Sequence, residues 1–131
     1  MRQRPLGAGF FLTLFATLLL GAGAAAAAPI DCGDPPMKGP AIPDGAHATR
    51  AEMLAAVNAV KAYSDAVDAY LKCKDQRALT VFQWMTEDQR RRWNEDLDAV
   101  HQRRVEVQRQ MNEAIRVFNQ SRAASDGTGG S

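Results

Sequence analysis

The sequence predicts an all-α protein: a long antiparallel two-helix hairpin, with an extended Pro/Gly-rich N-terminal segment tethered to it by a disulfide. Two capping boxes, which begin at Thr49 and Thr86, each mark the start of a helix. Apolar residues then recur in alternating steps of four and three, the spacing of a helix that buries one stripe and that is typical of a coiled coil. No Pro or Gly interrupts residues 46–123, so both helices can be long.

Residues 1–27 are expected to be a cleavable signal peptide. Arg2 and Arg4 give a basic start, an uncharged apolar run extends from Leu6 to Leu20, and small residues follow it. The apolar run is shorter than the about 20 residues that a membrane span needs. The mature chain is therefore expected to be exported to the periplasm and to contain no transmembrane segment.

The charge balance argues against nucleic-acid binding. The full chain carries 16 basic and 15 acidic residues, and the leader removes Arg2 and Arg4 but no acid. Subtracting these two leaves 14 basic against 15 acidic residues, a net charge of about −1 with neutral histidine. A nearly neutral chain lacks the basic surface that binds nucleic acid, so no such partner is expected.

Residues 28–48 are too rich in Pro and Gly to form a helix and are expected to be extended, with a turn at Asp44 and Gly45. Cys32 and Cys73 allow one intramolecular bridge, which an oxidising compartment favours. The segment can span roughly 50 Å in a polyproline-like form, more than the about 36 Å that a helix rises from Thr49 to Cys73. It is therefore expected to run back along the hairpin over the groove between the helices, which it would cover with Pro35, Pro36, Ile42 and Pro43.

The first helix is expected to start at Thr49 and to run almost to Trp84, with a break near residues 75–77 as the alternative. Tyr63 and Tyr70 widen its apolar stripe. The four-and-three steps fall on Met53, Val57, Val60, Ser64, Val67 and Leu71.

The second helix starts at Thr86, and the hairpin as a whole is expected to cover residues 49–121, followed by a disordered tail over 122–131. With the turn centred near Met85, Asp68 falls opposite Arg104, which predicts a partly buried salt bridge that fixes the register. Two helices alone bury little, so dimerisation into a four-helix bundle is also open. The stripe of this helix consists of Trp93, Leu97, Val100, Arg104, Val107, Met111, Ala114 and Phe118.

No catalytic motif is present, and we expect neither an enzyme nor a bound cofactor. The two histidines, His47 and His101, have no second histidine or cysteine at the spacing of a zinc site, so no metal is expected. Two carboxylate pairs lie at a separation of three residues on the helices, an arrangement that is usually a solvated flank. These pairs are Asp65 with Asp68 and Glu95 with Asp98.

The hairpin tip is the candidate interaction surface. Large apolar residues gather beside the predicted turn, and a basic run follows them. We expect Trp84 and Trp93 to close the end of the apolar stripe together, and the alternative is that the tip is a contact surface for a protein partner or a second copy. The candidate residues are Phe82, Trp84, Met85, Arg90, Arg91, Arg92 and Trp93.

Two resemblances bear on function. Residues 85–89, Met-Thr-Glu-Asp-Gln, resemble the Leu-Thr-x-x-Gln element of periplasmic stress chaperone and metal-resistance proteins, which implies a helical cradle that binds unfolded clients. A broader pattern is similar to a group of small exported proteobacterial proteins, which implies the fold and the export but no activity. This pattern comprises Ile42-Pro43-Asp44-Gly45, Val60-Lys61-Ala62-Tyr63 and Cys73. We therefore expect a binding protein that acts on a partner in the cell envelope, with a chaperone as the alternative.

Overall fold

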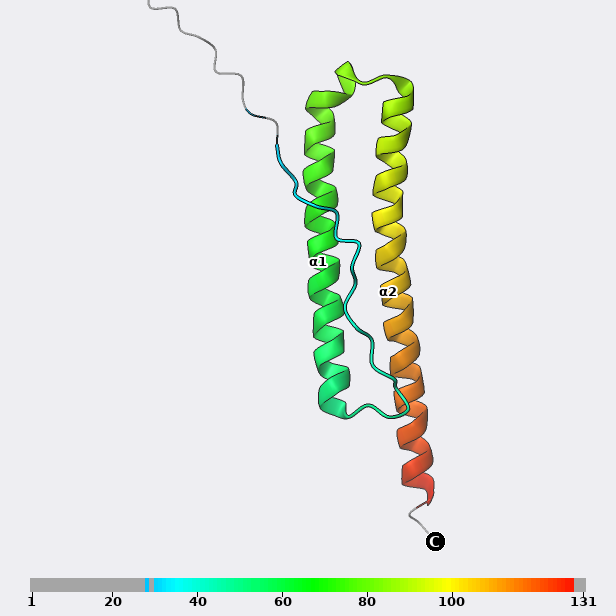
Figure 1. The fold of residues 1–131 in the computed structure, drawn as a ribbon. Helices are drawn as coiled ribbons and strands as arrows, with labels where there is room; N and C mark the ends of the chain where they lie inside the picture. The colour runs from blue at the N-terminus through cyan, green and yellow to red at the C-terminus, as the bar shows by residue number, and fades with distance from the viewer. Residues whose placement is uncertain (1–27, 29, 129–131) are drawn as a thin grey trace, which may run out of the picture.

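The computed structural model describes residue 28 and residues 30–128, and these confirm the predicted fold class (Figure 1). Helix α1 covers Arg50–Val81, a short 3-10 helix η1 covers Phe82–Trp84, and helix α2 covers Glu87–Thr128. The described residues contain no strand. The predicted leader, residues 1–27, lies outside the described residues, and none of the described helices is both long and apolar enough to cross a membrane.

Helix α1 begins at the predicted capping box. The Thr49 hydroxyl accepts a hydrogen bond from the Glu52 backbone N–H (3.2 Å), and the Glu52 carboxylate accepts one from the Thr49 backbone N–H (2.7 Å). The backbone bond from Thr49 lowers the pKa of Glu52. The helix continues through residues 75–77 without a break and ends at Val81, close to the predicted end.

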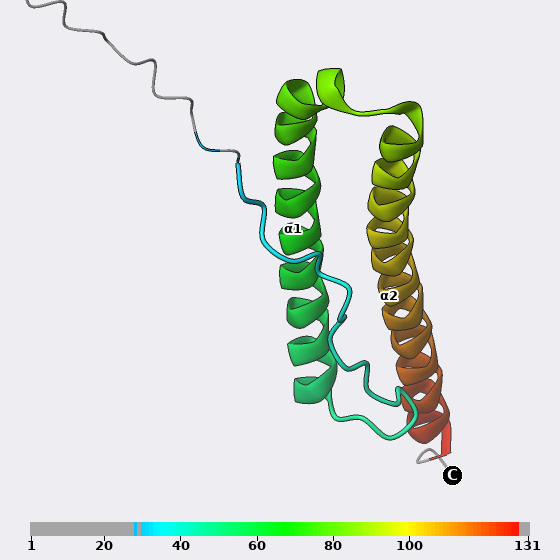
Figure 2. The same cartoon turned by 45° about the horizontal axis from the view of Figure 1, so that its top comes forward.

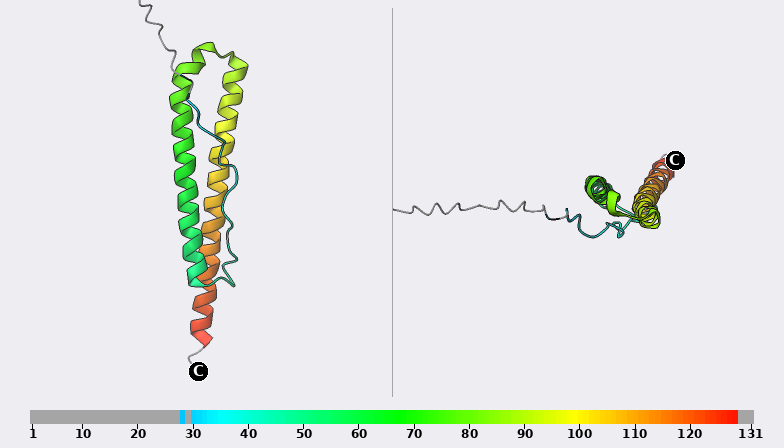
Figure 3. Two further views of the ribbon diagram at one scale, coloured as in Figure 1. Left: turned by 60° about the vertical axis from the view of Figure 1, so that its left-hand side comes forward. Right: turned by 90° about the horizontal axis from the view of Figure 1, so that it is seen from above.

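The extended segment crosses the groove between the helices as a strap, which we define as residues 32–48. Cys32 is bonded to Cys73 of α1, as predicted. The Tyr63 hydroxyl donates to the Pro36 carbonyl (2.9 Å), and Arg103 Nε of α2 donates to the Met37 carbonyl (3.2 Å). The strap therefore contacts both helices, and the views from two further directions place it along one face of the pair (Figures 2 and 3).

The lower end of the strap approaches α2 so closely that only glycine fits. A Cβ at Gly45 would lie 2.1 Å from the Ala114 carbonyl oxygen and 2.9 Å from the Phe118 nitrogen. The chain turns back here because the Asp44 carbonyl accepts hydrogen bonds from the backbone N–H groups of His47 and Ala48. This turn, which was predicted at Asp44 and Gly45, leads the strap into the start of α1.

The buried stripe of α1 differs from the predicted one. Val57 is 39% exposed, whereas its neighbour Ala56 is buried. Tyr63, which was expected to widen the stripe, is buried, and Ser64 is only half-buried. The strap explains the change, because it packs on the side of α1 that carries Ala56 and Tyr63 and covers residues that two helices alone would leave exposed. The buried core comprises Met53, Ala56, Val60, Tyr63, Val67, Val100, Val107, Met111 and Ala114.

The predicted salt bridge is present in the predicted register. The Arg104 guanidinium is hydrogen-bonded to the Asp68 carboxylate and lies 2.9 Å from His101 Nδ1. The Arg104 side chain is only 17% exposed, but that of Asp68 is 66% exposed, so one partner is covered and the other faces solvent. Below this pair, Gln108 of α2 donates to the Ser64 hydroxyl of α1 (3.1 Å), which adds a second polar link between the helices.

Helix α2 extends beyond the predicted hairpin end at residue 121 and reaches Thr128. The prediction of a disordered tail from residue 122 is thus wrong for residues 122–128, while 129–131 lie outside the described residues. Within α2 no Pro or Gly occurs before Gly127, and the Arg122 guanidinium packs on the Phe118 ring at 5.1 Å. Local composition and this contact allow the helix to continue past the base of α1 (Figure 1).

Gly45→Ala should destabilise the fold, because the new methyl group would overlap backbone atoms of α2. We expect the free energy of unfolding, measured by urea titration, to fall by at least about 2 kcal/mol. Gly127→Ala is the matched control, since a Cβ there meets nothing within 4 Å and alanine favours the helix. An equal effect of the two substitutions would contradict the close packing of the strap.

A double-mutant cycle on Asp68→Ala and Arg104→Ala should measure the interaction energy between these two side chains. We expect a coupling energy of about 0.5–1 kcal/mol at low salt, because Asp68 is largely solvated. The coupling should shrink at about 1 M NaCl as the charges are screened. Zero coupling at low salt would show that the two side chains do not interact in solution.

Candidate functional site

The hairpin tip is held by backbone and side-chain hydrogen bonds on both sides of the turn. The second predicted capping box is formed, with the Thr86 N–H donating to Gln89 Oε1 (2.8 Å) and the Gln89 N–H donating to the Thr86 hydroxyl (3.3 Å). Arg90 Nε reaches back across the turn and donates to the Phe82 carbonyl (3.1 Å). The tip therefore presents its side chains from a fixed backbone.

Phe82 and Trp93 close the end of the apolar stripe. Their rings meet edge to face with centroids 5.7 Å apart, and the Lys74 ammonium lies 3.8 Å from the centroid of the Trp93 ring. Such aromatic and cation–π contacts stabilise beyond the apolar area that they bury. Trp93 is thus half-buried, as expected of a residue that caps the hairpin core.

Trp84 does not take part in this closure, so the expectation that it would pack with Trp93 is wrong. Its side chain is 81% exposed, and Phe82 occupies the place against Trp93 instead. The reason is local: α1 ends at Val81 and Trp84 belongs to the 3-10 helix η1, so Trp84 does not continue the α-helical spacing of the stripe. The tip is therefore open at Trp84 rather than capped there.

Leu79 is a further exposed apolar residue that the sequence analysis did not select. It is 85% exposed and lies in the last turns of α1, directly after Ala78, which is half-buried. The exposure of Leu79 could be predicted from the sequence, because Leu79 lies outside the four-and-three steps of the stripe and so faces away from the core. Leu79 and Trp84 both leave large apolar side chains in solvent at this end of the hairpin.

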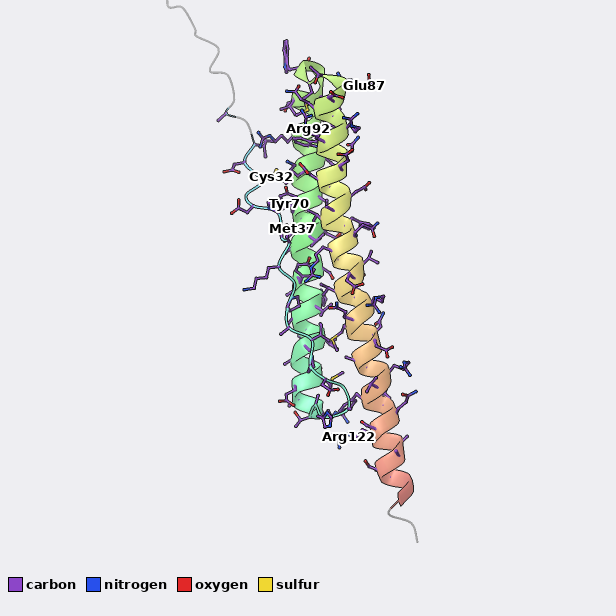
Figure 4. All side chains as sticks on the ribbon, turned by 45° about the vertical axis from the view of Figure 1, so that its right-hand side comes forward. Cys32, Met37, Tyr70, Glu87, Arg92 and Arg122 are labelled. Carbon is purple, nitrogen blue, oxygen red and sulfur yellow. A yellow bond between two sulfur atoms is a disulfide. The ribbon has the colours of Figure 1, made fainter. Side chains whose placement is uncertain are left out.

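The three arginines of the tip differ in their surroundings. Arg91 forms ion pairs with Asp88 (3.2 Å) and Glu95 (3.6 Å), and Arg90 is engaged with the Phe82 carbonyl. Arg92, labelled in Figure 4, is exposed and forms no ion pair with any residue that the structure describes. Of the three, Arg92 is therefore the one free to meet an acidic group on a partner.

The carboxylate pair Asp65 and Asp68 and the two histidines each contact a charged neighbour. Asp65 is bound by Lys61 (2.7 Å), whereas its neighbour Asp68 is bound by Arg104, and the His47 ring contacts Asp44 (2.6 Å). Within residue 28 and residues 30–128, no group of three or more His, Cys, Asp or Glu side chains is placed to hold a metal ion.

No protein-family model, curated protein or solved structure matches this chain. The geometry of the hairpin itself is therefore the basis for assigning a role.

The two tryptophans should differ sharply in their effect on stability. Trp84→Ala should change the free energy of unfolding by less than about 0.5 kcal/mol, because its ring is already in solvent. Trp93→Ala should lower it by about 2 kcal/mol, because it removes the contacts with Phe82 and Lys74. Urea unfolding followed by far-UV circular dichroism measures both without relying on tryptophan emission, and equal losses would contradict the open tip.

Proposed function

We propose that this protein is a non-enzymatic periplasmic protein that binds a protein partner in the cell envelope through its hairpin tip. The observation that carries the proposal is the exposure of Trp84 and Leu79, 81% and 85%, at the end of the hairpin whose turn hydrogen bonds hold fixed. A tip needed only to close the core would bury such side chains, as it does with Trp93.

The composition of the tip suits a protein interface. Trp and Arg are the residues most enriched among those that dominate binding energy, and Trp84 and Arg92 are both exposed here. Burying a Trp removes roughly 150–250 Å² from water, worth several kcal/mol at about 25 cal/mol per Å² before the entropic cost of association. A partner with an apolar recess and an acidic rim would meet both side chains.

The proposed location rests on the leader-like start of the chain and on the disulfide. The apolar run with its basic start has the form of an export signal. The bond between Cys32 and Cys73 is favoured in an oxidising compartment such as the periplasm.

A client-binding chaperone is the second candidate. The hairpin carries an apolar groove of about 290 Å³ that the strap does not line, with Val57, Met111 and Ile115 among its walls. Such a groove offers apolar surface to an unfolded chain, in keeping with the resemblance of residues 85–89 to the chaperone element. Binding of this kind would be promiscuous, whereas a dedicated partner would be single.

Photo-crosslinking from position 84 in intact cells tests the proposal and separates the candidates. We expect a photoreactive residue there to give one discrete heavier adduct, and the same residue at the exposed position of Gln102 in α2 to give none. A band at twice the mass of the chain would identify a second copy as the partner. A smear of many adducts would favour the chaperone, and no adduct would contradict docking through the tip.

A further inference from the structure

A cavity lies where the upper part of the strap crosses the two helices, apart from the exposed side chains of the tip. Its volume is about 400 Å³, and all three elements line it: Pro35 and Met37 from the strap, Tyr70 and Lys74 from α1, and Asp96 and Val100 from α2. Figure 4 shows Cys32, Tyr70 and Met37 close together along this part of the strap. A cavity of this size holds a small organic molecule.

The wall that the strap supplies is fixed in place. The disulfide to Cys73 holds the strap just before Pro35, and the hydrogen bonds from Tyr63 to the Pro36 carbonyl and from Arg103 to the Met37 carbonyl hold it just after. The floor is rigid as well, because Val100 is fully buried in the core. The cavity is therefore preformed rather than made by movement of a loose segment.

Two opposite charges line the cavity without pairing. Lys74 and Asp96 lie on facing helices, close to the antiparallel register that brings Asp68 to Arg104. Yet Lys74 packs its ammonium on Trp93 at 3.8 Å from the ring centroid, and the Asp96 carboxylate forms no hydrogen bond or ion pair with the described residues. One cation and one anion, the half-buried Lys74 and the exposed Asp96, thus line the cavity from facing helices without an ion pair between them.

Tyr70 adds a hydrogen-bond donor to the same space. Its hydroxyl has no hydrogen-bond partner among the described residues, and its ring lies 5.9 Å from the Lys74 ammonium. Burial, followed by the negative charges of Asp96 and Asp34, raises the pKa of Tyr70 against the opposing effect of Arg77. The phenol therefore stays protonated at neutral pH and donates a hydrogen bond to an acceptor.

We propose that this cavity binds a small zwitterion of the apolar α-amino acid class. The ligand carboxylate accepts hydrogen bonds from the Lys74 ammonium and the Tyr70 hydroxyl, and its ammonium lies against Asp96. Its apolar side chain contacts Met37 and Val100. A simple anion would leave Asp96 opposed to it and a simple cation would leave Lys74 opposed, whereas a zwitterion satisfies both charges.

Calorimetric titration with L-phenylalanine and L-leucine tests the site on the full mature protein with its disulfide intact. We expect saturable binding, and a change in Trp93 emission in a Trp84→Phe background, because the Lys74 ammonium moves relative to that ring. Two analogues of phenylalanine, 3-phenylpropionate without the ammonium and phenethylamine without the carboxylate, should each bind at least about tenfold more weakly.

Asp96→Asn is the variant that tests the assignment, because Lys74 also packs on Trp93 and its replacement would disturb the fold. It should weaken L-phenylalanine at least about tenfold and leave 3-phenylpropionate unweakened. Asp98→Asn, an exposed residue that makes the same change in net charge outside the cavity, should leave binding of both unchanged. Unaltered circular dichroism verifies that both variants fold.

Three results would overturn the proposal: no saturable binding of either amino acid up to about 10 mM, equal binding of phenylalanine and its one-charge analogues, or an Asp96→Asn variant that binds like the wild type. Because Trp84 and Leu79 do not line the cavity, a failure here leaves docking through Trp84 intact. The absence of a crosslink at position 84 would likewise leave the proposed binding in the cavity unaffected.

Discussion

Packing of the strap into the groove between α1 and α2 is the constraint on which the rest of the structure depends. A pair of helices buries a narrow stripe on each partner, which is a thin core for a domain of this size. The strap gives the pair a third layer, and its contacts through Tyr63, Arg103 and Gly45 decide which sides of the helices become interior. Held by the disulfide at one end and by the turn at Asp44 at the other, it makes the hairpin a packed domain.

Features encoded within a few residues were predictable from the sequence, and features that depend on the third layer were less so. The caps at Thr49 and Thr86 need only a hydroxyl and an acceptor three residues later, and both form as predicted. The register also follows from the position of the turn and the single charged residue, Arg104, in the stripe of α2. The exchange of Val57 for Ala56 in the core was not predictable in this way, because it depends on the side of α1 on which the strap settles.

The two candidate sites were also predicted only in part from the sequence. Sequence reasoning selected the tip, but it placed Trp84 inside, since spacing alone does not reveal that α1 tightens into a 3-10 turn there. It did not select Tyr70, Lys74 and Asp96 as a group, because no motif joins them and only the crossing of three elements brings them to one space. Lys74 links the two regions, because it lines the cavity while its ammonium packs on the Trp93 ring at the tip.

The position of the disulfide has a consequence for the order in which the molecule is assembled. Cys32 and Cys73 are separated by 41 residues, and both precede α2 in the chain. In a polypeptide that emerges N-terminus first, the strap and α1 can close into a covalent ring while α2 is still arriving. Helix α2 then packs onto a strap and an α1 that are already linked, so the disulfide has already removed part of the chain entropy that folding must lose. The packing of α2 is then the association of one helix with a preformed surface.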